Sequence, residues 1–398
     1  MNYKERLNLE LLNEEASVWI SPDINDNPVI IVKAPNNTIK SLINGCKIQL
    51  ILGLDDNHTP PVAHLGVKIF DFVSNPLLLT GTNRFIEENR SLLDFLENRQ
   101  APIFLYDELS ICAASGILEL DNLSQTDSLK LTNNITDLYV GPFSEDITLS
   151  LDCFDYTIDD TREFKNVQKI KVVYLDCKCK DWNCTIIDFI GLNTQESVII
   201  NNIDEGSSLE SKVWFSIESI FNFDVHLNPQ YSTSSGNKEL TDILAFYALG
   251  VFLIESKCLS IFNSEAAPIM DKKVRTLKKH IKKGIKQLSG AYRNIRAGTI
   301  IHSKKNQPIE FNRDIIPHCI VLVSELLPFG DWSEIEYLLM KTMIEEKIYL
   351  HVMDFREFMN LVKNSSQKKE YFDYYLMERA EAFTKSKSIH MRSNFKRK

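Results

Sequence analysis

Two acidic residues and a lysine stand close together in an otherwise apolar stretch of the sequence, LTDILAFYALGVFLIESKCLSIF. Glu255 and Lys257 are two positions apart, so a strand would point both side chains to the same face. If the chain turns between Ala248 and Leu249, Asp242 falls opposite Glu255 across a hairpin. The sequence therefore predicts two facing carboxylates with an ammonium group beside them.

Facing carboxylates repel one another and are unfavourable to bury unless a cation lies between them. Hard oxygen ligands of this kind suit Mg²⁺ or Mn²⁺, which keep water ligands and accept phosphate oxygens. A nearby lysine can reach an attacking water and a phosphate. The alternative is a solvated Glu-Lys pair on an edge strand, but the apolar residues on both sides of Glu255 and Lys257 favour a buried strand. We therefore expect Asp242, Glu255 and Lys257 to be catalytic, with both carboxylates as metal ligands.

Asp242, followed after twelve residues by Glu255-Ser256-Lys257, resembles the core motif of the PD-(D/E)XK (restriction-endonuclease-like) nuclease superfamily. The resemblance covers roughly residues 205–365, in the C-terminal half only. It implies that Asp242, Glu255 and the backbone carbonyl of Ser256 bind the metal, and that Lys257 positions or activates water.

The resemblance also assigns roles outside the hairpin. An acidic residue on the preceding helix often adds a metal ligand, and Glu210 is the first choice for it, with Glu218 the second. In many relatives a Gln or Lys of the following helix points into the site, which implies a catalytic role for Gln287 or, alternatively, Lys283. The chain departs from the family pattern at Thr241, where the family has a Pro.

The elements around the motif must form a layered domain if they are to hold it. We expect an α/β restriction-endonuclease-like domain over residues 205–385, with a central mixed sheet flanked by helices, and then a basic, disordered tail over 386–398. The expected elements are helix Ser207–Phe221, strands Leu240–Ala248 and Val251–Lys257, helix Asp271–Arg296, strand His318–Val323, helix Ser333–Glu345, strand Tyr349–Met353, and helices Phe355–Val362 and Lys368–Phe383.

The helix expected over Asp271–Arg296 is strongly basic. Its apolar residues recur at steps of three and four, and its basic residues fall on one flank with no acid after Asp271 in the same helix to relieve them. A phosphate backbone would relieve this repulsion, although a solvated lysine-rich face is the alternative. The residues expected to bind nucleic acid are Arg275, Lys278, Lys279, Lys282, Lys286, Arg293 and Arg296.

The first half of the chain predicts a separate β-rich α+β domain over residues 1–204. Its short β-branched runs are divided by Asn, Asp, Gly and Pro, and residues 123–137 have the composition of a loop. The expected elements are strands Pro28–Lys33, Lys47–Leu52, Val62–Phe72 and Pro102–Tyr106, helix Phe85–Glu97, and strands Lys169–Leu175 and Thr185–Ile190.

Charge is divided unevenly between these halves. Residues 1–229 carry a net charge of −18 and residues 230–398 a net charge of +9, within a total of −9. A basic half suits a polyanion such as DNA or RNA, whereas the acidic half does not. The first domain is therefore expected to bind a protein partner, mediate oligomerisation, act as a sensor, or shield the basic half as an autoinhibitory module.

Composition excludes several classes of protein. The 398 residues are 44% hydrophobic and 25% charged, with no apolar run long enough to cross a membrane and no signal-peptide core, so a cytoplasmic protein is expected. The eight cysteines are scattered, which favours reduced thiols, and zinc binding by Cys177, Cys179 and Cys184 stays open. No Gly-rich phosphate loop is present, which argues against ATP or GTP hydrolysis.

These observations predict a Mg²⁺-dependent (or Mn²⁺-dependent) endonuclease that acts on DNA, with RNA as a possible substrate. By analogy of fold alone, such a domain beside a sensor module resembles the effectors of bacterial anti-phage defence and restriction systems. The alternative is a catalytically inactive member of the same fold that binds nucleic acid or a protein partner.

Overall fold

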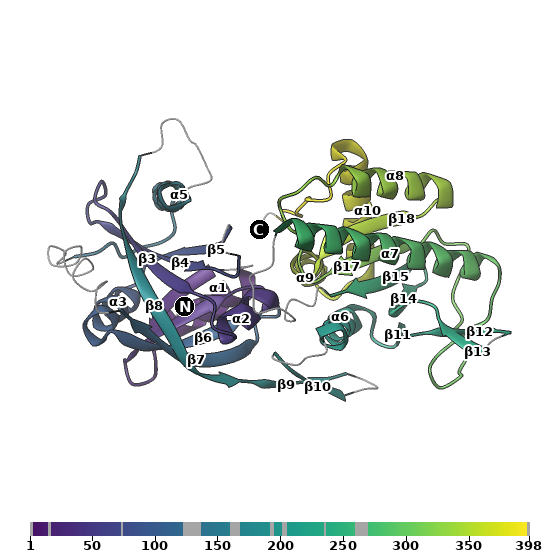
Figure 1. The fold of residues 1–398 in the computed structure, drawn as a ribbon, viewed down its shortest axis with the longest axis horizontal. Coiled ribbons are helices and arrows are strands. Elements are labelled where there is room, and N and C mark those ends of the chain that lie inside the picture. The colour runs from purple at the N-terminus through teal and green to yellow at the C-terminus, as the bar shows by residue number, and fades with distance from the viewer. Residues whose placement is uncertain are drawn as a thin grey trace. The chain divides into compact units, whose positions relative to one another are not determined.

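The computed structural model describes residues 3–14, 17–72, 75–121, 137–159, 168–191, 195–200, 205–234, 236–258 and 270–395. The chain divides into two compact units, unit 1 with residues 1–186 and 199–201, and unit 2 with residues 187–198 and 202–398 (Figure 1). The expected boundary at residue 204/205 placed the hairpin of β9 (Ile186–Ile190) and β10 (Gln195–Ile199) in the first domain. Most of that hairpin belongs to unit 2, because Phe189 packs on Phe215 of unit 2 at a ring-centroid distance of 5.0 Å.

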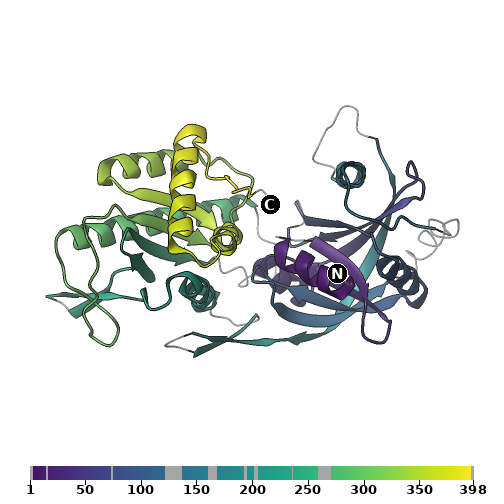
Figure 2. The same ribbon diagram turned by 180° about the vertical axis from the view of Figure 1, so that it is seen from behind.

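Unit 1 is built on one eight-stranded sheet, in the order β1-β2-β6-β7-β8-β3-β4-β5. Figure 2 shows the ribbon of this unit from behind. The two edge strands approach each other, since the Ser17 hydroxyl of β1 donates to the Thr80 carbonyl of β5 at 2.8 Å. The sheet is therefore strongly curled. Its strands are β1 (Ser17–Pro22), β2 (Pro28–Lys33), β3 (Ile48–Asp55), β4 (Val62–Ile69), β5 (Leu77–Thr82), β6 (Gln100–Tyr106), β7 (Cys112–Leu120) and β8 (Lys171–Cys184).

The helices of unit 1 are α1 (Tyr3–Asn13), α2 (Asn36–Ile43), α3 (Ile86–Asn98) and α5 (Glu145–Ile158). The mixture of strands and helices expected for this half is confirmed, and the strand predicted over Pro28–Lys33 has those bounds in the structure. The strand predicted over Lys169–Leu175 continues to Cys184. The loop predicted over residues 123–137 lies almost entirely outside the described residues.

Unit 2 contains a mixed five-stranded sheet in the order β11-β14-β15-β17-β18. The pairs β11/β14 and β14/β15 are antiparallel, whereas β15/β17 and β17/β18 are parallel. A central mixed sheet was expected here, and every strand predicted for this part is present. The strands are β11 (Val225–Leu227), β14 (Ile243–Tyr247), β15 (Gly250–Lys257), β17 (His318–Val323) and β18 (Tyr349–Asp354).

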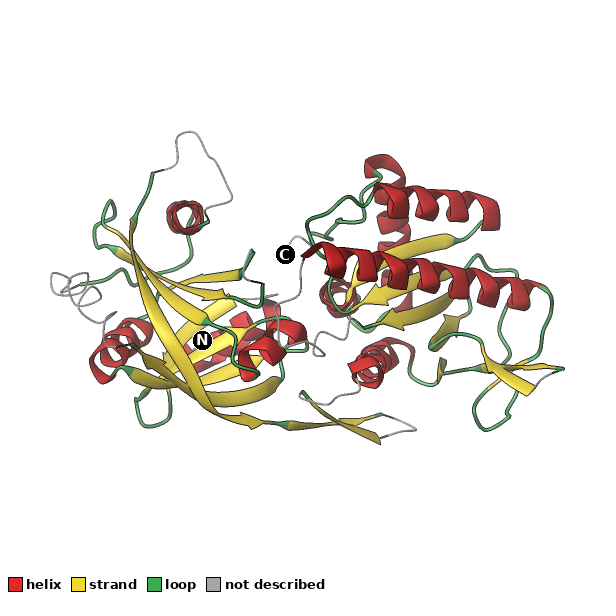
Figure 3. Cartoon of the chain, viewed as in Figure 1, coloured by secondary structure: helices red, strands yellow, loops and turns green. Residues whose placement is uncertain are grey.

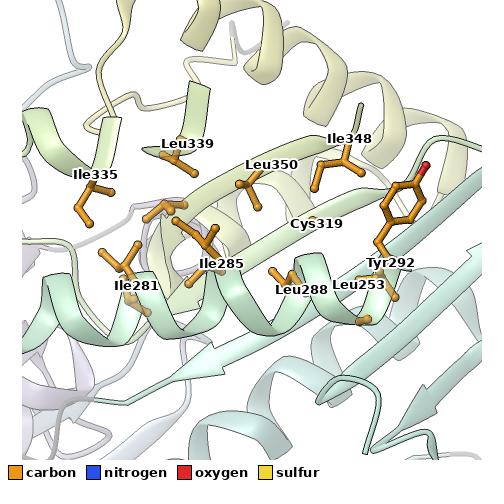
Figure 4. Packing of buried hydrophobic residues seen from close by; sticks show 14 of the residues in the cluster. Leu253, Ile281, Ile285, Leu288, Tyr292, Cys319, Ile335, Leu339, Ile348 and Leu350 are labelled. Atoms are coloured by element: carbon orange, nitrogen blue, oxygen red, sulfur yellow. The ribbon is translucent and has the colours of Figure 1, made fainter. Parts of the chain in front are cut away.

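Helices cover both faces of this sheet (Figure 3). On one face, Leu253 and Val321 pack against the apolar stripe of α7 and against α8 (Figure 4). On the other face, Phe252 packs against Phe221 and Phe372, with centroid distances of 4.9 and 5.6 Å. The helices are α6 (Glu205–Phe221), α7 (Met270–Arg296), α8 (Ser333–Glu346), α9 (Phe355–Asn364) and α10 (Lys369–Ser386).

A second, smaller sheet in unit 2 consists of β12 (Gln230–Thr233), β13 (Gly236–Glu239) and β16 (Ile301–His302), and is called the small sheet below. Gln230 pairs with Glu239 on one side and with His302 on the other. The chain therefore leaves the small sheet at Glu239 and enters β14 only a few residues later.

The expectation of a free basic tail after residue 385 is wrong for the described part of that segment. α10 continues to Ser386, and Ile389 behind it is buried. Arg392 forms a two-pronged ion pair with Asp354, with both N–O distances at 2.5 Å. The backbone N–H of Ser393 donates to Glu357 at 3.0 Å. The buried carboxylates on β18 and α9 thus fix residues that a charge count alone assigns to solvent.

Candidate active site

The β14–β15 hairpin has the register predicted from the sequence. Tyr247 pairs with Gly250 and Ile243 with Ile254, so the next position along places Asp242 opposite Glu255. Both side chains are buried, with exposed fractions of 6% for Asp242 and 1% for Glu255. The two carboxylates therefore meet where the hairpin ladder ends.

Side chains replace the backbone ladder at this end. Asp242 Oδ2 accepts hydrogen bonds from the backbone N–H of Ser256 at 2.6 Å and from its hydroxyl at 2.8 Å. The Thr241 hydroxyl donates to the carbonyl of Ile254 at 2.7 Å and lies 3.4 Å from Glu255 Oε2. Thr241, which stands where the family that the motif resembles has Pro, thus ties the start of β14 to β15.

Lys257 lies on the same face of β15 as Glu255. Its Nζ is 2.6 Å from Glu255 Oε1, and both side chains are largely buried. An ion pair of this kind compensates only part of the penalty of burying two carboxylates. The ammonium group of Lys257 therefore balances only one of the two carboxylates, Asp242 and Glu255.

Several carboxyl groups act on one another electrostatically at this end of the hairpin. Burial, and then the charges of Asp242 and Glu239, raise the pKa of Glu255 to about 7 against the lowering effect of Lys257. Burial and the same two charges raise the pKa of Glu210 to about 7. Burial, the charge of Asp242 and a hydrogen bond with that carboxyl raise the pKa of Glu239. We call Glu210, Glu239, Asp242 and Glu255 the carboxylate cluster.

Glu210 and Glu218, the two acidic residues considered on the preceding helix, have different surroundings in the structure. Glu210 lies near Asp242, whose charge adds to burial in raising the pKa of Glu210. Glu218, the second choice, is directed elsewhere, because its carboxylate lies against Gly191 beside the β9–β10 hairpin. Glu239 was not predicted, since nothing in the sequence around the exposed strand β13 marks it as part of the site.

The basic flank of α7 is not free of acids, contrary to the expectation from the helix alone. Lys282 and Arg293 form ion pairs with Glu334 and Glu346 of α8. Lys278 lies over the ring of Trp332 at 5.8 Å from its centroid. Part of this flank therefore faces α8. Of the other residues predicted to bind nucleic acid, Arg275, Lys279, Lys286 and Arg296 are exposed.

Another flank of α7 faces the carboxylate cluster. Burial and the charges of Lys257 and Lys283 lower the pKa of His280, which places His280 near the site lysine. Gln287 lies two turns further along the helix, about 10 Å away along its axis. It is exposed and forms no hydrogen bond with the described residues. His280 was missed because a lone histidine on a lysine-rich helix gives no signal in the sequence.

The oxygen atoms of this site are of the kind that a hard divalent cation binds. Asp242, Glu255 and the carbonyl of Ser256 offer oxygen ligands, and the charge of Asp242 adds to burial in raising the pKa values of Glu255 and Glu210. In the described part of the chain, no three His, Cys, Asp or Glu side chains are arranged to hold a metal ion. An ion held here would therefore rely on two carboxylates, a carbonyl and water.

The cysteines considered for zinc do not converge on one point. Cys177 and Cys179 line a cavity of about 430 Å³ in unit 1 together with Cys46, but Cys184 does not. Burial raises the pKa of Cys46, Cys177 and Cys179 to about 12, so these thiols stay protonated at neutral pH. The described residues hold no zinc-like group.

A serine, a histidine and an aspartate also meet in unit 1. The Ser150 hydroxyl lies 2.8 Å from His64 Nε2 and donates to Asp55 at 2.7 Å. The aspartate contacts the serine rather than the histidine, which is the wrong order for a hydrolase triad. Ser150 is 1% exposed. The group is best explained as the polar anchor that holds α5 on the sheet.

A histidine pair lies under the other face of the unit 2 sheet. His318 Nδ1 is 3.0 Å from His351 Nε2, and His318 Nε2 is 2.8 Å from Asp373. The Tyr247 hydroxyl donates to the same carboxylate at 2.6 Å. Burial and the charges of His318 and Arg379 lower the pKa of His351 well below its usual range. The histidines are too deeply buried to meet a substrate, and they join β17 and β18 to α10.

Comparisons of the chain with protein-family models, with curated proteins and with solved structures found no match. None of the helices in the described ranges combines the length and the apolar composition that crossing a membrane requires. The resemblance to the PD-(D/E)XK nucleases therefore depends on the residues and the local geometry of unit 2.

Proposed function

We propose that unit 2 is a metal-dependent nuclease of the PD-(D/E)XK type that hydrolyses phosphodiester bonds. The observation that carries the proposal is the buried end of the β14–β15 hairpin, where Asp242 faces Glu255 and Lys257 lies 2.6 Å from the latter. The order of elements supports it, since the hairpin follows one helix and precedes a long helix, a strand, a helix and a strand.

Each residue of the site has a role in this proposal. Asp242, Glu255 and the carbonyl of Ser256 would hold Mg²⁺ or Mn²⁺, and Glu210 would bind through water from α6. The ion, when bound, supplies positive charge to the phosphate and lowers the pKa of a bound water. Lys257 would orient the attacking water and donate to a phosphate oxygen from its place beside Glu255. Ser256 and Thr241 hold the carboxylates in position through their hydrogen bonds.

A catalytically inactive protein that binds nucleic acid is the second candidate. It is favoured by one observation, namely that Asp242 Oδ2 and Glu255 Oε1 already have protein partners in Ser256 and Lys257. In that case the four carboxyl groups would have no ion to relieve their repulsion. Two buried carboxylates that face each other across the hairpin make the metal-binding function the better supported of the two.

The deciding experiment incubates the full chain with labelled duplex DNA, single-stranded DNA and RNA, with Mg²⁺, Mn²⁺ or EDTA. Cleavage of at least one substrate is expected with metal and none with EDTA. Asp242→Asn should abolish it, because an amide is a poor ligand for a divalent ion but can still accept the Ser256 hydrogen bonds. The matched control Asp314→Asn changes an exposed carboxylate and should cleave normally. Metal-independent cleavage, or none at all, would reject the proposal.

Metal affinity is expected to fall as the pH is lowered from about 8 to about 6. Protons compete with the ion for Glu255 and Glu210, whose pKa values are about 7. One competing proton lowers the apparent affinity by up to about tenfold per pH unit below the pKa, and two by up to about 100-fold. Calorimetric titration of the full chain with Mn²⁺ across this range measures the effect. An affinity that does not change with pH would contradict carboxylate ligation.

A further inference from the structure

The lysines and arginines of unit 2 differ in whether they already have an acidic partner. Lys273 pairs with Glu325 at 3.1 Å, and Lys282 and Arg293 pair with acids of α8. Another set is exposed and forms no ion pair within the described residues, and we call it the uncommitted lysines. These are Lys279, Lys283 and Lys286 on α7, and Lys238, Lys304 and Lys305 in or beside the small sheet.

The small sheet presents its lysines next to the carboxylate cluster. The charge of Lys304 lowers the pKa of Glu239, whose carboxyl shares a hydrogen bond with Asp242. Lys304 and Lys305 lie at the tip of a tight turn, which is closed by hydrogen bonds between Ser303 and Gln307 at 2.8 Å and between Asn306 and Ser303 at 2.9 Å. Asn306 has a φ of 59°, a backbone conformation that asparagine tolerates. The turn therefore has a defined shape.

α7 presents its own lysines to the same cluster. His280 is close enough to Lys257 for the lysine to lower its pKa, and Lys283 and Lys279 act on His280 in the same way. Lys283 is exposed. Lys304 thus lies near Glu239 of the carboxylate cluster, and Lys279 and Lys283 lie near His280, which is itself close to Lys257. Lys282 and Arg293, by contrast, pair with acids of α8.

We propose that the backbone of a nucleic acid is bound by the uncommitted lysines, with the small sheet as a second binding element beside α7. The α8-facing residues Lys282 and Arg293, which pair with Glu334 and Glu346, contribute little. A lysine that must first leave a carboxylate contributes less to the affinity for a phosphate. An unpaired lysine displaces a counterion condensed on the nucleic acid without breaking an ion pair of the protein. A narrow β-ribbon is also an element that enters a DNA groove. The identity of the polyanion rests on the proposed nuclease function, but the choice of lysines does not.

The test measures binding of the full chain to a labelled DNA duplex and to RNA by fluorescence anisotropy, in EDTA and at several salt concentrations. Lys304→Ala with Lys305→Ala is compared with Lys282→Ala with Arg293→Ala, which removes the same charge from the α8-facing flank, where both residues pair with acids. The first pair should weaken binding about tenfold and reduce the slope of log affinity against log salt by about 2. The second pair should change the affinity less than about twofold. Unchanged melting temperatures show that both variants fold.

The outcomes separate this inference from the nuclease proposal. If the wild-type chain binds with this lysine dependence but does not cleave, the surface stands and the nuclease proposal fails. If the chain cleaves, but the α8-facing pair matters as much as the Lys304 and Lys305 pair, the surface inference fails. Absence of any binding to DNA or RNA also overturns it.

Discussion

Glu255→Gln is expected to abolish metal-dependent cleavage and yet to stabilise the metal-free protein at about pH 8. The variant removes a metal ligand, and losing several kcal/mol of transition-state stabilisation corresponds to a rate roughly a thousandfold lower. The gain in stability follows from the pKa. Burial and the charges of Asp242 and Glu239 raise the pKa of Glu255 from 4.5 to about 7, so the folded chain binds this proton more tightly than the unfolded chain.

The sign of the linkage sets the pH window. The contribution of Glu255 to the free energy of unfolding is greatest below about pH 4.5 and is lost as the pH rises through about 7. A glutamine carries no charge to bury, so above about pH 7 the variant should be more stable, by an amount of the order of 1 kcal/mol. The loss of the Lys257 ion pair subtracts from this gain.

Denaturant unfolding in EDTA at about pH 4.5 and about pH 8, together with the cleavage assay, measures both effects. Glu310→Gln is the matched control, since Glu310 is exposed, and it should change neither stability nor cleavage. Cleavage that survives in Glu255→Gln would remove Glu255 from the active site. A variant that is less stable at about pH 8 would mean that hydrogen bonds to the carboxylate outweigh its repulsion by Asp242 and Glu239.

The hairpin could be predicted because its information is local. A tight turn fixes the register of the strands that it joins, so the position of the turn was sufficient to place Asp242 opposite Glu255. The same holds for the helix Met270–Arg296 and the strand His318–Val323, whose apolar patterns span many residues. Short elements such as α2 and β5, with weaker patterns, were not predicted.

The partners of the basic flank could not be predicted from helical periodicity. Periodicity shows that Lys282 and Arg293 share a flank, but not which element packs beside it. Their acids, Glu334 and Glu346, are more than 50 positions away on α8, as the sequence separations of 52 and 53 show. His280 was missed for the same reason, because it joins the site through the charge of Lys257 on another element. Glu239 is only three positions before Asp242, but its strand belongs to the small sheet, so the register of the hairpin does not place it.

The C-terminal segment shows the same limit of composition. Residues 387–395 are polar and basic, which favours a solvated tail. Asp354 and Glu357 are the side chains that fix the segment, and they belong to β18 and α9. A basic segment is ordered when buried acidic side chains of the folded domain bind it, and a charge count cannot show whether such side chains are present.

Glu357→Ala is expected to be the most destabilising single substitution in unit 2. The carboxylate is fully buried, and its Oε1 accepts from Arg379 Nη1 at 3.0 Å and from the Ser393 hydroxyl at 2.7 Å. Removing it leaves the buried guanidinium of Arg379 without its counter-charge, which costs about 3–5 kcal/mol. It also removes an anchor of residues 387–395, so trypsin should cut at Arg392 more readily than in the parent chain.

The double variant Glu357→Leu with Arg379→Met separates charge from packing. If the penalty of Glu357→Ala is that of an uncompensated buried cation, removing both charges should recover most of the lost free energy of unfolding, because apolar replacement of a buried ion pair is often close to neutral. Trypsin should still cut at Arg392 in the double variant, since the Ser393 hydrogen bonds are missing there too. Denaturant unfolding and limited proteolysis of the full chain measure the two effects. A double variant that is as unstable as Glu357→Ala would show that the Ser393 anchor, rather than the charge of Arg379, determines the stability of this end of unit 2.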